Sequence, residues 1–294
     1  MSDERGMCRP AAPRWRKPVL KGFCILLGAG ALIVSAPAAG QAASEEFRHA
    51  LYDQILKEYV VDGHVDYARL KENRSDLDQY IALLAGLEPH VYAIWNTPAK
   101  IAFWVNAYNA ITLKVILDHY PIQRVFSPAT FVFPANSIRQ IPGAWDRITH
   151  SVMGRPMTLD EMEHRVLRKE FQEPRIHMAL VCAAKGCPPL RSEAYEGERL
   201  EGQWEDQARR FLSDPARFRL DQRERVVRLS SIFQWFGQDF LNAYGAPEGF
   251  TGHTDIERAV LAFVSRYLKS EDQTFLKAGN YRVVYVGYDW NLNE

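Results

Sequence analysis

The sequence predicts an α+β fold, a single helix-rich domain around a buried central helix with a small, mostly antiparallel sheet. Three observations lead to this prediction. Apolar residues recur at helical spacing through most of the chain, strand-like segments are short and flank turns, and the two kinds of element are interspersed without regular strand–helix alternation. Irregular alternation argues against a doubly wound sheet. Papain-like and transglutaminase-like arrangements are the candidates within this class.

Residues 1–43 have the pattern of a signal peptide. Six basic side chains precede an apolar run from Gly22 to Ala36, and small residues follow it. The run has about 15 residues, fewer than the roughly 20 that a spanning helix needs. We therefore expect cleavage between Ala38 and Ser44, a periplasmic or secreted protein, and no membrane span after cleavage. An uncleaved N-terminal anchor is the alternative. Residues 44–294 then form the single domain.

The first elements after the leader are two amphipathic helices with a turn between them. Asp62-Gly63 is the turn, between two short β-prone pieces. The apolar stripes that predict the helices are Phe47, Leu51, Ile55 and Tyr59 for the first, and Leu77, Tyr80, Ile81 and Leu84 for the second.

The stretch from Thr97 to Tyr120 predicts the central helix. Thr97 is the expected N-cap, Pro98 suits the first helical position, and Pro121 stops the helix. The stretch is apolar on nearly every face, which indicates burial. Asn106 and Asn109 lie three residues apart and share a face. They either tie loops to the core or line a site.

The second half alternates between hairpins and helices. Its predicted elements are a hairpin at Gly154-Arg155, a helix from 159 to 171 with a Thr158–Glu161 capping box, a helix over 200–211, a hairpin at Gln222-Arg223, a helix over 230–244 ended by Gly245, a helix capped by Thr254 and Glu257, and a final strand from Tyr281 followed by a polar-aromatic tail.

The stretch "RIHMALVCAAKGCPPL", residues 175–190, is predicted to be a buried strand that runs into a loop. Cys182 and Cys187 are the two cysteines that survive cleavage of the leader. They form a disulfide, act as reactive thiols, bind a metal with His164 or His177, or are inert. The four residues between them fit neither a C-x-x-C redox motif nor a usual zinc knuckle. Lys185 is placed to lower a thiol pKa.

Glu163 and His164 are the expected partners of Cys182. Glu163 falls inside the apolar arc of its predicted helix, and His164 lies at the edge of that arc. A carboxylate in such an arc needs a partner or a raised pKa. They form either a Glu–His pair at a pocket wall, or an acid tied to an Arg beside an exposed His. His177 would point away from Cys182 in a regular strand, which indicates a hydrogen-bonded structural role.

Charge and motifs exclude several function classes. The whole chain has 36 basic and 36 acidic side chains, and the first 43 residues hold six of the basic and two of the acidic ones. The remaining domain therefore has 30 basic and 34 acidic side chains. A slightly acidic domain argues against a nucleic-acid surface. No G-x-S-x-G, Walker A, H-E-x-x-H or G-x-G-x-x-G pattern occurs, and no cofactor or metal is expected.

Five blocks, in order, resemble those of the domain of unknown function 547 family: "VDYARL", "FWVNAYNAITLKVILDHYP", "LDEMEHRVLR", "RIHMALVCAAKGCPPLRSEAY" and "YDWNLN". They span about residues 64 to 293. The resemblance implies no established activity. It implies an exported bacterial member, and fusions of relatives to glutaredoxin-like or DEP domains point to thiol chemistry, peptide chemistry or a scaffold role. The matched blocks include Asn106, Tyr108, Asn109, Glu163, His164, Cys182, Asp289 and Trp290.

Two functions of different classes follow, and the sequence does not decide whether the protein is an enzyme. The first is a periplasmic thiol-dependent enzyme for peptide-like or thiol substrates, with Cys182 as nucleophile, His164 as base and Glu163 or an asparagine as orienter. Cys187 would shape the loop or resolve an oxidised Cys182. The second is a binding module stapled by a Cys182–Cys187 disulfide. Its pocket would be lined by Trp104, Tyr108, Trp145 and Trp290. Asn106, Asn109 and Asp289 are further binding candidates. The substrate and the oligomeric state stay open.

Overall fold

The computed structural model describes residues 47–126 and 130–294, so the predicted signal peptide lies outside the described residues. The helices are α1 (Ala50–Tyr59), α2 (Tyr67–Glu72), α3 (Ser75–Gly86), α4 (Pro89–Ala93), α5 (Thr97–His119), η1 (Ile138–Gln140), η2 (Glu161–Phe171), η3 (Pro174–Met178), η4 (Gly197–Arg199), α6 (Leu200–Ser213), α7 (Ser231–Tyr244), α8 (Asp255–Ser265) and α9 (Ser270–Ala278). None of these described helices is both long and apolar enough to cross a membrane.

The strands form three small sheets. They are β1 (Val60–Val61), β2 (His64–Val65), β3 (His150–Val152), β4 (Arg155–Met157), β5 (Phe218–Asp221), β6 (Val226–Ser230) and β7 (Arg282–Val286). Every pair is antiparallel except β6 with β7, which run parallel in the order β5-β6-β7. The predicted α+β class with small, mostly antiparallel sheets is confirmed.

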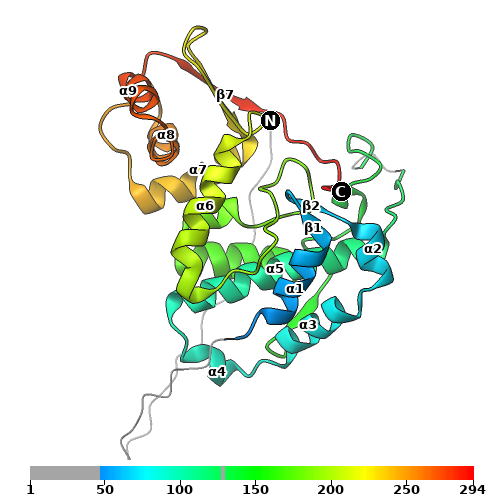
Figure 1. Ribbon diagram of the computed structural model, residues 1–294. Helices are drawn as coiled ribbons and strands as arrows, with labels where there is room; N and C mark the ends of the chain where they lie inside the picture. The colour runs from blue at the N-terminus through cyan, green and yellow to red at the C-terminus, as the bar shows by residue number, and fades with distance from the viewer. Residues whose placement is uncertain (1–46, 127–129) are drawn as a thin grey trace, which may run out of the picture. The chain divides into compact units, whose positions relative to one another are not determined.

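Helix α5 is the central element, as its all-round apolar sequence predicts (Figure 1). Of its 23 residues, 17 are buried. The N-cap is Asn96, whose side chain accepts from the Ala99 N–H at 2.8 Å, so the predicted cap at Thr97 is wrong by one residue. Asparagine caps well because its side-chain oxygen satisfies an orphan N–H of the first turn.

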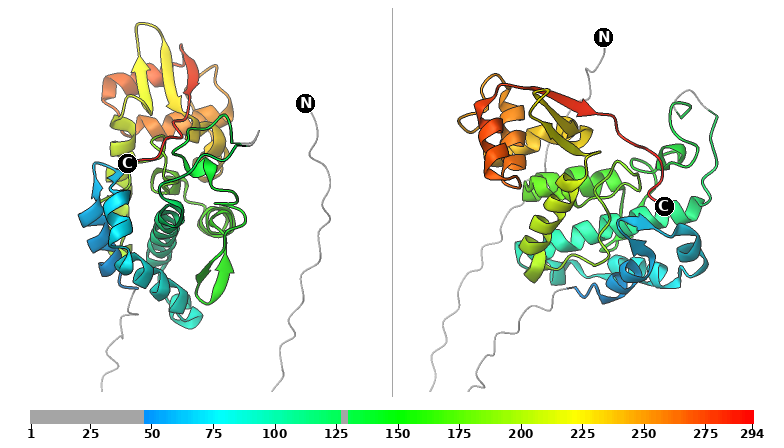
Figure 2. Two further views of the ribbon diagram at one scale, coloured as in Figure 1. Left: turned by 90° about the vertical axis from the view of Figure 1, so that its right-hand side faces the viewer. Right: turned by 45° about the horizontal axis from the view of Figure 1, so that its top comes forward.

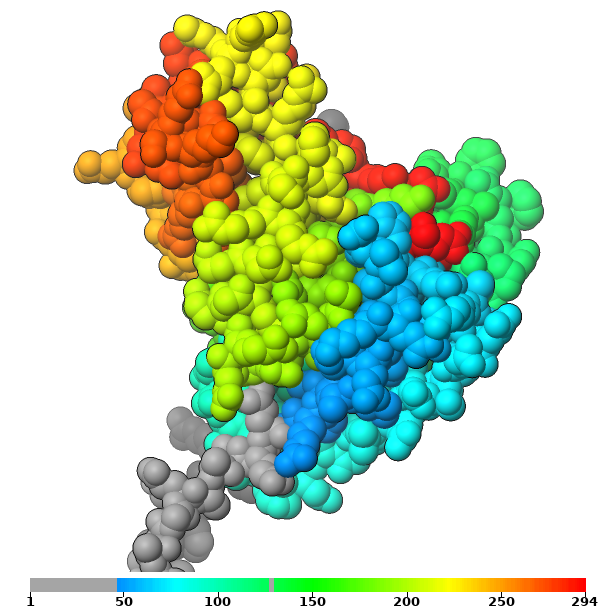
Figure 3. Space-filling model, viewed as in Figure 1, coloured from blue at the N-terminus to red at the C-terminus, as the bar shows by residue number. Residues whose placement is uncertain are grey.

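The buried apolar residues form two cores. The larger surrounds α5 and takes residues from α1, α3 and η2. The smaller is built from α6, α7, α8 and the β5-β6-β7 sheet. Figure 2 shows α7, α8 and α9 gathered at this sheet. In Figure 3 the yellow-green residues of α6 lie between the blue N-terminal helices and the orange C-terminal helices.

The tail after β7 runs back to the first half of the chain, as the red segment in Figure 3 shows. Asn293 accepts from the Val65 N–H at 2.8 Å through its backbone oxygen, and Leu292 donates to the Asn136 backbone at 3.0 Å. Ala184 pairs with Leu292 as an isolated bridge. The C-terminal residues are therefore held against the cysteine loop.

The predicted strand over "RIHMALVC" is wrong. Residues 174–178 form the 3₁₀ helix η3, and residues 179–182 after it belong to no strand. The backbone of residues 179 and 181 instead forms hydrogen bonds with a side chain. Asn109 accepts from the Val181 N–H at 2.9 Å and donates to the Ala179 carbonyl at 3.0 Å. A short buried apolar run is compatible with a strand or with a helical segment, because periodicity alone cannot separate the two.

Helix η2 is wound as a π-helix. Its capping box forms as predicted, with the Glu161 N–H donating to the Thr158 hydroxyl at 3.2 Å and the Thr158 N–H to Glu161 at 3.1 Å. The predicted inward arc is also correct, since Met162, Glu163 and Val166 are buried. Full turns of π-helix are rare and recur at functional sites. This helix forms one wall of the pocket described next.

Candidate functional site

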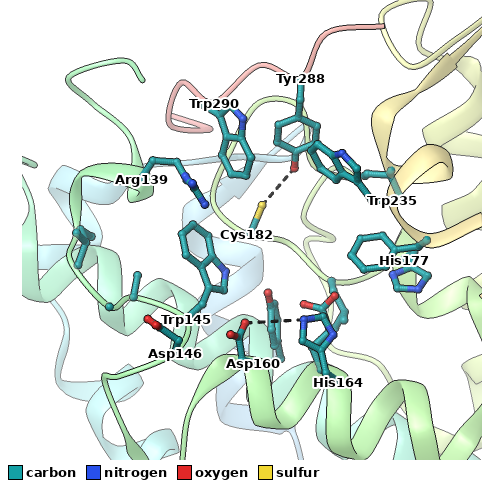
Figure 4. Close-up of a pocket in the computed structure, with 18 of the residues that line it drawn as sticks. Arg139, Trp145, Asp146, Asp160, His164, His177, Cys182, Trp235, Tyr288 and Trp290 are labelled. Atoms are coloured by element: carbon teal, nitrogen blue, oxygen red, sulfur yellow. Dashed lines mark hydrogen bonds and ion pairs between the residues drawn. The ribbon is translucent and has the colours of Figure 1, made fainter. Parts of the chain in front are cut away.

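A pocket of about 510 Å³ lies where η2, the cysteine loop, α7 and the tail meet (Figure 4). Tyr108 of α5, Glu163 and His164 of η2, and Cys182 line it. The loop from 139 to 146 completes the wall. This volume falls in the range of small-molecule sites, about 300–1,000 Å³. Of the predicted site residues, the structure brings six together at this pocket: Tyr108, Trp145, Glu163, His164, Cys182 and Trp290.

The structure holds both cysteines as free thiols. Their Sγ atoms lie 2.7 Å apart, against about 2.05 Å for a disulfide bond. Cys182 is partly exposed and lines the pocket, whereas Cys187 is 1% exposed. The two sulfur atoms therefore lie close enough together to react with each other.

Hydrogen bonds converge on the buried sulfur. The Cys182 N–H and the Tyr288 hydroxyl each donate to Cys187 Sγ at 3.0 Å. Burial opposes ionisation of Cys187, but the hydrogen bonds from Cys182, Tyr288 and the backbone outweigh it and lower the pKa of the Cys187 thiol. The hydrogen bond with Cys187, followed by burial, raises the pKa of Cys182. When one of the two thiols ionises, the hydrogen bonds therefore favour the negative charge on Cys187 over Cys182.

The backbone around Cys182 is held on both sides. Before it, the Asn109 amide fixes residues 179–181. After it, Ala183 has φ 58°, in the left-handed region that alanine rarely adopts. Gly186 donates to the Asp289 carbonyl at 2.8 Å, and a Cβ there would lie 2.9 Å from the Asp289 nitrogen. Glycine is needed at this position because the tail approaches so closely.

Glu163 is a buried carboxyl that lines the same pocket as Cys182. It is 9% exposed, and burial raises its pKa to about 7 although a hydrogen bond with Tyr108 acts in the opposite direction. Its charge also contributes to raising the pKa of Cys182. Burial raises the pKa of Tyr108, and the nearby charges of Glu163 and Cys182 raise it further. A carboxyl with a pKa near 7 can accept or release a proton at neutral pH.

His164 has other partners than Cys182. Its Nδ1 accepts from Arg168 at 3.0 Å, and its Nε2 lies 3.9 Å from Asp160. Burial, followed by the charge of Arg168, lowers the pKa of His164. In Figure 4 the dashed line from His164 runs to Asp160, and the line from Cys182 runs to Tyr288. Within the described residues no hydrogen bond joins Cys182 and His164.

His177 is hydrogen-bonded, as expected, but at the pocket wall. Its Nε2 lies 2.8 Å from Asp239, and its ring stacks on Phe236 with centroids 4.0 Å apart. Arg168 binds Asp239 through two nitrogens, at 2.6 and 2.9 Å. His177 and Arg168 therefore share one carboxylate. Burial lowers the pKa of His177.

Asn106, Asn109 and Asp289 do not line the pocket. Asn106 donates to the Tyr195 carbonyl at 2.8 Å and accepts from its N–H at 3.0 Å. Asn109 holds the segment before Cys182, and Asp289 accepts from Asn291. The two asparagines have the loop-tying role. Trp104 lies outside the pocket too, with its indole donating to Tyr92 at 2.9 Å.

The pocket contains residues that sequence reasoning missed. Arg139 lies over the rings of Phe133, Trp145 and Trp290 at 4.4, 5.5 and 5.1 Å. Trp235 and Tyr288 form the opposite wall, with centroids 4.9 Å apart. The aromatic-rich tail was the available signal for Tyr288. Nothing local marks Arg139, because its role depends on rings far away in the chain. In the described part of the chain no cluster of three or more His, Cys, Asp or Glu could hold a metal ion.

The raised pKa of Glu163 predicts a pH dependence of stability. In the unfolded chain this carboxyl titrates near 4.5, and in the folded chain near 7. The folded state holds the proton more tightly, so the contribution of Glu163 is greatest below pH 4.5 and is lost as pH rises through 7. The full difference is about 3 kcal/mol.

The measurement is the free energy of unfolding from pH 4.5 to 8, for the parent and for Glu163→Gln. The parent's value should fall relative to the variant's as pH rises. Burial lowers the pKa of His164 and His177, so these histidines make both proteins more stable as pH rises. Subtracting the variant's free energy of unfolding from the parent's removes this shared contribution. A difference that does not change with pH would contradict the burial of an ionisable Glu163.

A family model described as "Protein of unknown function, DUF547" matches residues 93–212. The match confirms the family resemblance drawn from the sequence blocks. It covers α5, η2 and the cysteine loop, and leaves α7 and the tail outside. Neither the comparison with curated proteins nor that with solved structures finds a significant match.

Proposed function

We propose that this chain, whose residues 93–212 belong to the DUF547 family, carries out thiol–disulfide exchange with a ligand bound over Cys182. The observation that supports this most is the pair of sulfurs 2.7 Å apart, one facing a pocket and one buried. Exported location is part of the proposal and rests on the pattern of residues 1–43 alone. An oxidising compartment would supply disulfide substrates.

The reaction runs in two exchanges. Cys182 loses its proton, and its sulfur attacks one sulfur of the substrate disulfide, whose S–S bond breaks. One half of the substrate leaves as a thiol, and the other stays on Cys182 as a mixed disulfide. Cys187 then loses its proton, and its sulfur attacks Cys182 Sγ. The mixed-disulfide bond breaks, and the second half of the substrate leaves as a thiol. The protein dithiol is oxidised to a disulfide, the substrate disulfide is reduced to two thiols, and the two thiol protons end on the products.

Cys182 is the attacking sulfur because it is the one that lines the pocket. Cys187 is almost fully buried but lies within bonding reach of Cys182, which suits the second exchange. The hydrogen bonds that lower its pKa favour its reactive thiolate form. Tyr288 contacts both sulfurs, at 3.2 and 3.0 Å, and can stabilise whichever one carries the charge.

Glu163 is the proposed proton acceptor for Cys182. It is close enough for its charge to act on that thiol, and its pKa of about 7 suits proton transfer at neutral pH. His164, the base expected from the sequence, is engaged by Arg168 and half-exposed. The proposed base therefore lies on η2, as the sequence predicted, but it is Glu163 instead of its neighbour His164.

The experiment that tests this function uses the reduced protein and bis(2-hydroxyethyl) disulfide, a small uncharged substrate. Mass spectrometry of the peptide with both cysteines should show the loss of two hydrogen atoms, and free 2-mercaptoethanol should appear in twofold amount. Thiols that stay reduced in the folded protein, but react once it is unfolded, would refute exchange as the function.

The two candidate bases are distinguished by a matched pair of variants. Glu163→Gln should slow the first exchange at pH 7 by at least about tenfold, because the proton acceptor is lost. His164→Gln should change the rate by less than about threefold. The rate of 2-mercaptoethanol release, followed from pH 5 to 9, is the readout. The reverse order of the two variants would restore His164 as the base.

A further inference from the structure

Arg139 is a cation at the pocket with no carboxylate partner among the described residues. Three aromatic rings hold its guanidinium, at 4.4 to 5.5 Å. In Figure 4 the guanidinium points toward Trp145 and the space in front of Cys182. Aromatic faces fix a guanidinium in place without neutralising its charge. Its five N–H groups suit a carboxylate.

Two carboxylates lie on the other side of Trp145. Asp146 is 3.8 Å from Arg147, and Asp160 is 3.9 Å from His164. Both distances exceed hydrogen-bond length, so neither carboxylate is saturated by its neighbour. The Asp160 N–H donates to the Trp145 carbonyl at 3.0 Å, which ties the two acids to one wall. Figure 4 shows Arg139 and the two acids on opposite sides of the Trp145 ring.

We propose that the pocket takes a zwitterionic thiol or disulfide of amino-acid type, with its carboxylate at Arg139, its ammonium at Asp146 and Asp160, and its sulfur at Cys182. This inference rests on the proposed function and names its substrate class. The pocket volume of about 510 Å³ suits a small molecule. Aromatic side chains on several sides would cover the carbon skeleton.

The charge pattern argues against other ligand classes. A polyphosphate would meet one guanidinium and two carboxylates, so repulsion would exceed attraction. A ligand with only positive charge would face Arg139. Opposite charges placed on either side of one ring instead fix the orientation of a zwitterion, which brings its sulfur to the partly exposed thiol.

The experiment measures binding without exchange. S-methyl-L-cysteine is the probe, because its thioether cannot react with Cys182. Its carboxamide lacks the carboxylate, and its N-acetyl derivative lacks the ammonium. Titration calorimetry on the reduced protein should show each derivative binding about tenfold more weakly or worse, since each loses charge-assisted hydrogen bonds.

Variants locate the effect. Arg139→Gln should weaken the binding of S-methyl-L-cysteine about tenfold and leave the binding of its carboxamide unchanged. Asp160→Asn should weaken the binding of S-methyl-L-cysteine about tenfold and leave the binding of its N-acetyl derivative unchanged. Arg165→Gln is the control, since Arg165 lies on η2, is 77% exposed in its side chain and pairs with Glu161. It removes the same charge outside the pocket and should change affinity less than about twofold.

The outcomes separate the two claims. Equal binding of all three probes, or equal effects of Arg139→Gln and Arg165→Gln, would overturn the substrate class. Binding that depends on Arg139 in a protein that exchanges no disulfide would refute the proposed function and leave a zwitterion-binding pocket. Fast exchange with uncharged disulfides and no preference for zwitterions would leave the function and refute the inference.

Discussion

Cys187→Ser should accumulate a mixed disulfide on Cys182 when it is treated with a small disulfide, and Cys182→Ser should accumulate none. Cys182 faces the pocket, so it meets the substrate first. The second exchange needs Cys187, whose sulfur lies 2.7 Å away. Without it, the intermediate cannot resolve. Intact mass spectrometry would show an adduct on nearly every molecule of one variant and on none of the other.

Serine is a suitable replacement at both positions. Its hydroxyl can accept the hydrogen bonds that the Cys182 N–H and Tyr288 give to Cys187, so the loop should keep its conformation. A thermal melt of each variant controls for this. Adducts on Cys187 in the Cys182→Ser protein would reverse the roles of the two sulfurs.

Val105→Asp should unfold the domain. Val105 is fully buried at the middle of α5, and an unpaired buried carboxylate is among the costliest single changes, at least about 4 kcal/mol. The helix contributes to the larger core along most of its length, so the loss should not stay local. Equilibrium unfolding in urea measures the change.

Val61→Asp is the matched control, because it makes the same chemical change at a residue that is 69% exposed. Its expected cost is within about 0.5 kcal/mol. If Val105→Asp unfolded at the parent's urea midpoint, α5 would not be the core of the domain.

The elements that the sequence predicted well carry their own local signals. The capping boxes at Thr158 and Thr254 and the Gly245 helix end each depend on a few neighbouring residues. The apolar surface of α5 predicts burial on all sides for the same reason. Such signals need no knowledge of distant contacts.

The failures share one cause, which is dependence on residues far apart in the chain. The segment before Cys182 lacks a strand partner because an Asn109 side chain takes the partner's place. His164 is turned to Arg168 and Asp160, and Glu163 lines the same pocket as Cys182. Arg139 enters the site only through rings at 133, 145 and 290. No spacing rule within a single helix or loop encodes these contacts.

The central claim is that Cys182 and Cys187 form a reversible dithiol–disulfide pair in the folded protein. Equilibrating the protein with graded mixtures of reduced and oxidised glutathione, then alkylating the free thiols and counting them by mass, tests it most directly. We predict that the two thiols disappear together, as one two-electron transition to an internal disulfide, and return together on reduction. Thiols that persist across the whole range, or that are lost only as separate glutathione adducts, would contradict the account.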